Sequence, residues 1–87
     1  MEREKIIDDI EVILHSENAL HLKGRQKPSS KNISDMIKVY SKTPDELKQD
    51  LILALEYRTS NRIFKGLEYF FLEFLIKINR KDLVWYY

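Results

Sequence analysis

The scarcity of glycine and proline is the feature that most limits how this chain can fold. Only two glycines and two prolines occur among its 87 residues. Sheets need frequent turns, which these residue types favour, whereas long helices need few. Apolar residues also recur every three or four positions in four segments, as they do on one face of a helix. The sequence therefore predicts an all-α fold: a small bundle of three to four helices ending in an antiparallel helical hairpin.

Capping and breaking residues set the expected boundaries within a single domain. We expect a first helix over about 3–21, a basic loop over 22–31, a second helix over about 33–41, a third over about 44–58, a fourth over about 61–80 and an aromatic tail over 83–87. Gly24 is the expected stop after the first helix, and Asn32 is the expected cap of the second. Each of these residue types favours the end of a helix over its interior.

The clearest local signal is "TPDEL", residues 43–47. Thr43 is the expected N-cap of the third helix, with Pro44 at the first helical position. Glu46 lies three residues after Thr43 and would complete a capping box.

Two irregularities interrupt the apolar pattern. Glu17 falls on the apolar stripe of the first helix, so that helix would either fray there or continue past it. Residues 58–62 are polar and break the pattern between the third and fourth helices. An unbroken helix over 44–80 would be about 55 Å long, whereas a compact domain of this size has a radius of gyration of about 12 Å. We therefore expect a break at 59–61, the alternative being one long helix that a partner chain would bury.

Charge is segregated along the chain. Residues 1–17 hold six acids and two bases, and residues 18–44 hold six bases and one acid. The stretch "HLKGRQKPSSKN" contains four basic residues and no carboxylate. Its simplest interpretation is an exposed, comparatively mobile loop with its lysines in solvent. The alternative is contact with phosphate or nucleic acid, for which the candidate residues are Lys23, Arg25, Lys27, Lys31, Lys38, Lys42, Arg58 and Arg62.

Two features weaken the nucleic-acid interpretation. No aromatic residue is interleaved with the basic ones, so stacking on single-stranded bases has no platform. A helix-turn-helix over 32–51 would present Asp45 and Glu46 in the first turn of its second helix, where phosphates would repel them.

Catalytic and metal-binding patterns are absent from the sequence. There is no cysteine, no glycine-rich phosphate loop and no ligand spacing typical of metal sites. His15 and His21 are six positions apart, about 240° around a helix, so they do not share a face. We interpret both histidines as surface or boundary residues and expect no enzyme activity, no cofactor and no metal.

The fourth helix carries more apolar surface than a small bundle needs. Phe64, Leu72 and Ile76 lie off the face expected to point to the core, and three aromatic residues end the chain. Exposed apolar patches mark binding surfaces, so we expect a homodimer or a protein partner at Phe64, Leu72, Ile76, Trp85, Tyr86 and Tyr87. The competing arrangement places this helix wholly at the centre, with the tail folded over it as a lid. Gly66, inside this helix, is expected at a close helix crossing or a partner contact.

The leading functional hypothesis is a small non-enzymatic interaction module: a regulator, inhibitor or adaptor. A small DNA- or RNA-binding regulator is the alternative. In length and helical layout alone, the chain also resembles bacteriocin-immunity proteins. The charged N-terminus is unlike a signal peptide, and charges interrupt the most apolar segment, so we expect a cytoplasmic protein that does not insert into membranes.

Overall fold

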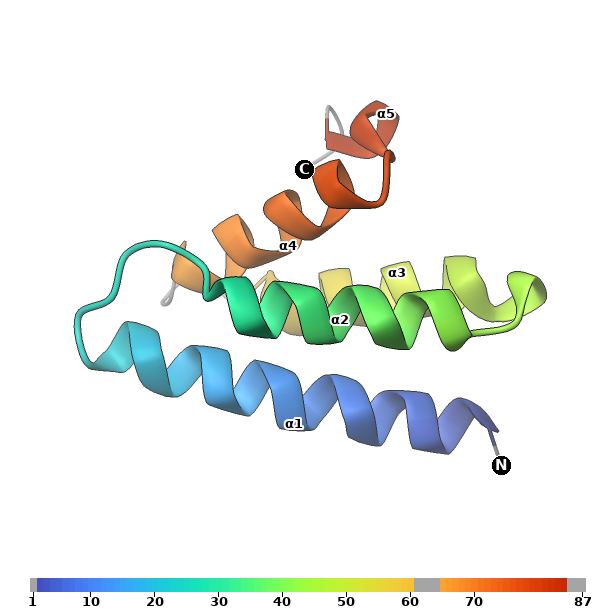
Figure 1. Cartoon of the computed structure of the whole chain (residues 1–87), viewed down its shortest axis with the longest axis horizontal. Coiled ribbons are helices and arrows are strands. Elements are labelled where there is room, and N and C mark those ends of the chain that lie inside the picture. Colours follow the sequence, from blue (N-terminus) through green and yellow to red (C-terminus); the bar gives the residue numbers. More distant parts are fainter. Residues whose placement is uncertain (1, 61–64, 85–87) are drawn as a thin grey trace.

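The computed structural model describes residues 2–60 and 65–84 and shows five helices there (Figure 1). α2 (Ser30–Lys42) and α3 (Asp45–Thr59) both pack against α1 (Glu2–Leu22). α4 (Lys65–Lys77) packs against all three and leads into the short α5 (Lys81–Val84). No strand occurs within the described residues. The predicted fold class, a small all-α bundle, is confirmed.

Two ion pairs show how α1 and α3 are oriented relative to each other. Arg3 contacts Asp50 at 2.6 Å, and Glu11 contacts Arg58 at 3.4 Å. Both pairs join α1 to α3 at the same sequence separation, so these helices run parallel. α2 runs in the opposite direction between them in the chain, and α4 turns back across the three at an inclination (Figure 1).

The core lies between α4 and the other helices. Phe70 and Phe74 of α4 are fully buried, and the ring of Phe74 meets Tyr40 of α2 edge-on at 5.7 Å between centroids. This geometry is one that aromatic pairs favour. The remaining core residues come from every long helix and are Ile10, Ile13, Leu14, Ile33, Met36, Leu51, Ile52, Leu55, Leu67, Phe71 and Leu75.

Two helices end in the same hydrogen-bonded turn. After α1, Gly24 has φ +98°, its N–H donates to the His21 carbonyl, and the Arg25 N–H donates to the Leu20 carbonyl. This is the Schellman pattern, and it confirms Gly24 as the stop. After α4, Asn79 with φ +63° is the left-handed residue of the same pattern. The fourth helix therefore ends at Lys77, short of the expected residue 80.

The expected cap of α2 is wrong. Ser29, not Asn32, is the N-cap, and its side chain accepts a hydrogen bond from the Asn32 N–H at 3.4 Å. The helix begins at Ser30, about a turn before the expected start. Asn32 is buried instead, because its side-chain amide binds a carboxylate of α1.

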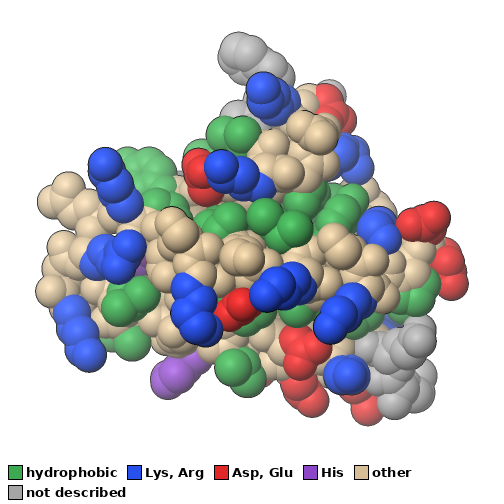
Figure 2. Space-filling model, in the orientation of Figure 1, with side chains coloured by type: hydrophobic (Ala, Val, Ile, Leu, Met, Phe, Trp, Pro, Cys, Tyr) green, Lys and Arg blue, Asp and Glu red, His purple; other side chains and the backbone are tan. Residues whose placement is uncertain are grey.

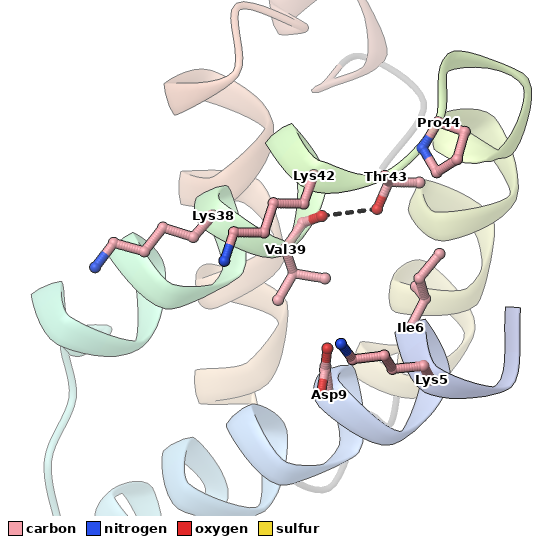
Figure 3. Close-up of a pocket in the computed structure, with 8 residues that line it drawn as sticks. All are labelled: Lys5, Ile6, Asp9, Lys38, Val39, Lys42, Thr43 and Pro44. Carbon is pink, nitrogen blue, oxygen red and sulfur yellow. Dashed lines mark hydrogen bonds between the residues drawn. The ribbon is translucent and has the colours of Figure 1, made fainter. Parts of the chain in front are cut away.

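The capping box at residues 43–46 does not form, which corrects a second expectation. Pro44 is the N-cap of α3, and no side chain caps that helix. Thr43 ends α2 instead: its hydroxyl donates to the Val39 carbonyl at 2.7 Å (Figure 3). The Thr43 hydroxyl therefore bonds within α2, although the sequence pattern had assigned it to the N-cap of α3.

The break between the third and fourth helices is confirmed at its first residues. α3 ends at Thr59, where the hydroxyl bonds back to the Leu55 carbonyl at 2.8 Å, and Ser60 follows with φ −78° and ψ 8°. The long-helix alternative is wrong, since the longest dimension is 36 Å against the roughly 55 Å such a helix needs. Asn61 lies outside the described residues.

We expect Thr43→Ala to lower the free energy of unfolding by about 1 kcal/mol, because it removes a partly buried hydrogen bond. Glu46→Ala should change it by less than about 0.5 kcal/mol, because Glu46 is exposed and caps nothing. Urea denaturation measures both values. A loss of equal size in the two variants would show that the capping box forms in solution.

Candidate functional site

α4 has one side that the other helices do not cover, which we call the α4 outer strip and define as Tyr69, Leu72 and Ile76. These residues recur at helical spacing, on the side opposite the buried Phe70 and Phe74. Tyr69 is 54% exposed and Ile76 is 40% exposed, while Leu72 is half-buried. The strip therefore presents apolar surface on the same helix that supplies the centre of the core.

A groove runs beside this strip, between α2 and α4, with a volume of about 600 Å³. Pro28, Ile33 and Ile37 supply its apolar lining. Figure 2 shows this side of the molecule, with hydrophobic side chains in the band between the two helices and basic side chains around it. The charged residues that line the groove are Lys27, Lys38, Glu73 and Lys77. We call this feature the α2–α4 groove.

The sequence-predicted interface residues fall in two groups. Leu72 and Ile76 lie off the core-facing side of α4, as the helical periodicity indicated. Phe64 and the tail residues Trp85, Tyr86 and Tyr87 lie outside the described residues. Tyr69 was not among the candidates, although its helical position next to Ile76 and Glu73 already placed it on the outer side.

The predicted phosphate-contact residues that the structure describes are not brought together at one point. Lys23, Arg25 and Lys27 lie in the loop before α2 and are all exposed, as expected of this stretch. The loop is nevertheless tied to α1 by the Arg25 backbone bond, and the Arg25 side chain donates to the Lys27 carbonyl at 3.1 Å. The basic stretch is therefore a solvated loop with fixed ends.

The other predicted phosphate contacts lie on helices. One face of α2 carries Lys31, Lys38 and Lys42, the latter two lying seven and eleven residues after Lys31. All three are exposed. Asp35 interrupts this face, and it forms an ion pair with Lys31 at 3.0 Å. Arg58 donates to Glu11 and to the Ala54 carbonyl, so it is already engaged within the bundle. Arg62 lies outside the described residues.

A second, smaller groove lies between the start of α1 and the end of α2, with a volume of about 230 Å³. Figure 3 shows Lys38 and Lys42 extending from α2 on one side, with Lys5 and Asp9 of α1 on the other. The ends of Lys5 and Asp9 point toward one another. An anion entering here would meet the Asp9 carboxylate as well as the lysines, which makes this a poor phosphate site.

The interior holds a polar cluster around Glu17 that sequence reasoning missed. Glu17 is fully buried within a continuous α1, so the helix does not fray there. Its carboxylate accepts the Ser29 N–H at 3.2 Å and the Asn32 side-chain amide at 3.0 Å. Ser29 is the N-cap of α2, so this negative charge also lies at the positive end of that helix. These contacts join the start of α2 to the last turns of α1.

His21 completes the cluster and corrects the expectation of a surface or boundary residue. Its side chain is only 6% exposed, and Nε2 lies 2.6 Å from Glu17 Oε2, outside hydrogen-bond geometry. Nδ1 lies 2.7 Å from the Arg25 carbonyl oxygen, so Nδ1 donates there. The Glu17 carboxylate and the His21 ring therefore pack against each other in the interior. His15, by contrast, is exposed as expected.

Gly66 of α4 lies directly over the His21 ring. A Cβ added at Gly66 would lie 2.5 Å from Nδ1 and 2.7 Å from Cδ2 of that ring. Such contacts are too short to be tolerated without movement, so only glycine fits between α4 and the cluster. The expected close crossing at Gly66 is confirmed, and its neighbour is the imidazole ring.

One surface ion pair perturbs titration. Arg80 donates to Asp82 at 3.2 Å across the turn between α4 and α5. This hydrogen bond holds the pKa of Asp82 below its ordinary value and raises the pKa of Arg80. Both groups face solvent, where such pairs contribute little to stability, and neither lies in a groove.

Within the described residues, no group of three or more metal-ligating side chains is brought together. None of the helices described has the length and apolar character needed to cross a membrane. Comparison with protein-family models, curated proteins and solved structures found no match to this chain.

We expect Glu17→Leu to lower the free energy of unfolding by roughly 3–5 kcal/mol, because it leaves the Ser29 N–H, the Asn32 amide and His21 without their buried partner. Glu17→Gln keeps one acceptor oxygen and should cost less. Guanidinium denaturation of both variants provides the measurement. Equal stability of the leucine variant and the wild type would mean that the cluster contributes nothing.

Gly66→Ala should destabilise the protein by about 1–3 kcal/mol through overpacking against His21. In an open helix the same substitution would stabilise by up to about 1 kcal/mol, so the sign alone is informative. In a double-mutant cycle with His21→Ala, Gly66→Ala should lower the free energy of unfolding much less once the imidazole ring is absent. If the two substitutions lower the free energy of unfolding additively, the cost of Gly66→Ala does not come from contact with His21.

Proposed function

We propose that this chain is a small non-enzymatic interaction protein, a regulator, inhibitor or adaptor, which binds another protein surface through the α4 outer strip. One observation carries the proposal: α4 packs against every other helix, yet Tyr69 and Ile76 remain exposed beside an apolar groove. Tyrosine and large aliphatic side chains next to a concave apolar surface are typical of protein-binding sites. The helix that fixes the core also holds this surface rigid, which reduces the entropy lost on binding.

A competing apolar surface exists on α3, where Leu53 and Tyr57 are exposed. The groove beside Leu53, between α1 and α3, is lined by Arg3 and Asp50, which already form a 2.6 Å ion pair with each other. Its charged groups are therefore satisfied within the chain. The α2–α4 groove differs, because Lys27 and Lys38 form no ion pair within the described residues. We therefore favour the α4 side.

Nucleic-acid binding is the second candidate, favoured by the common face of Lys31, Lys38 and Lys42 on α2. Asp35 on the same face and its pairing with Lys31 weaken that candidate. An inhibitor would agree with the resemblance to bacteriocin-immunity proteins, which extends to length and helical layout alone.

The test places a photo-crosslinking amino acid at Tyr69 or, as a matched control, at Tyr57 on α3. Both are exposed helical tyrosines. In cells that express the chain, we expect a discrete covalent adduct from position 69 and none from position 57. Adding Ile76→Glu should abolish the adduct, whereas Leu53→Glu should not. Adducts at position 57 alone would refute the proposal, and salt-sensitive retardation of duplex DNA that Lys31→Ala/Lys38→Ala/Lys42→Ala abolishes would favour the second candidate.

A further inference from the structure

We propose that the α2–α4 groove receives helix α1 of a second copy of the chain, so that two copies form a closed, reciprocal dimer. This inference rests on the proposed function, since it names the partner that occupies the surface beside the α4 outer strip. It follows from the charges that the fold places on two separate surfaces of the same molecule.

The groove is a cationic channel with an apolar lining. Lys38 stands on its α2 side and Lys77 on its α4 side, and Lys27 stands in the loop before α2. Among the described residues, Glu73 is the one carboxylate that lines it, and its carboxylate lies 3.8 Å from the Lys77 ammonium. The lining therefore carries a net positive charge of two, above Pro28, Ile33 and Ile37. A segment that fits it must be acidic and must offer an apolar side chain.

α1 carries a surface of that kind, which we call the α1 acidic strip and define as Glu4, Asp8 and Glu11. At about 100° per residue these three positions lie within about 60° of one another on the outer side of α1, and all three are exposed. Val12 lies beside them and is 71% exposed. Within the described residues, Glu4 and Asp8 form no ion pair.

The dimensions of the two surfaces are compatible. α1 has 21 residues and α2 has 13, which correspond to lengths of about 31 Å and about 20 Å. A docked α1 can therefore extend along the whole groove. There Glu4 and Asp8 would meet Lys38 and Lys77, and Val12 would meet the apolar lining, while Glu11 stays paired with Arg58 of its own chain.

Each copy offers both surfaces, so a two-fold arrangement uses both at once. The α1 acidic strip of one copy lies in the groove of the other, and the reverse contact forms by symmetry. This arrangement also brings the neighbouring Tyr69 and Ile76 of each copy next to the docked helix. The opposite charges of residues 1–17 and 18–44 then serve association rather than internal neutralisation alone.

Charge exchange between the two surfaces tests the proposal. The first variant is Lys38→Glu/Lys77→Glu, the second is Glu4→Lys/Asp8→Lys, and Lys23→Glu/Lys81→Glu is the control. All six side chains are exposed, so circular dichroism should show folded proteins. In sedimentation equilibrium we expect the wild type to have twice the 10.5 kDa chain mass. Each of the first two variants alone should weaken dimerisation at least about tenfold, and the control less than about threefold.

An equimolar mixture of the first two variants should restore the dimer, because both contacts of the mixed pair again join opposite charges. Failure to restore it overturns the inference, as does a wild type that stays monomeric at high concentration. A monomer whose Tyr69 position crosslinks to a different protein would leave the proposed function standing and remove only the second copy as partner. A dimer that tolerates both charge variants but not Ile76→Glu would likewise overturn this arrangement alone.

Discussion

The buried carboxylate of Glu17 is the interaction on which the arrangement of the helices depends. A charge in the interior is tolerated only if its neighbours supply hydrogen bonds and opposite charge. Here the Ser29 N–H and the Asn32 amide supply hydrogen bonds, and the positive end of α2 lies beside the carboxylate. The His21 ring packs against the same carboxylate from the other side of the basic loop. The loop therefore begins and ends at the same buried group. This fixes α2 against α1, and through the glycine above His21 it also fixes the start of α4.

The placement of α4 explains why one of its sides stays exposed. Its buried side forms the centre of the core, and three helices are enough to cover that side alone. The α4 outer strip stays exposed because no described helix packs on that side of α4, and the α2–α4 groove lies beside it. The same fold turns the acidic residues of α1 to solvent.

Local patterns predicted some features and misassigned others. Gly24 was recognisable as a stop because only a residue that tolerates positive φ ends a helix in that turn. Asn79 plays the same part less visibly, since asparagine also occurs within helices. Thr43 was assigned to the wrong helix, because its hydroxyl can bond backward to Val39 as readily as it can cap the next helix. Of the candidate site, Leu72 and Ile76 were predicted from periodicity, whereas Tyr69 was not.

The sequence by itself determined the fold class and most helix boundaries, because periodicity and turn residues act over a few neighbouring positions. It also determined the exposure of the basic loop, whose charges are stable only in water. The tertiary structure alone decided the meaning of Glu17, His21 and Gly66. In the sequence these are a misplaced charge, an isolated histidine and a poor helix former. Glu17 and Gly66 depend on contacts more than ten residues away, since only folding brings Asn32 to Glu17 and the α4 backbone onto the His21 ring.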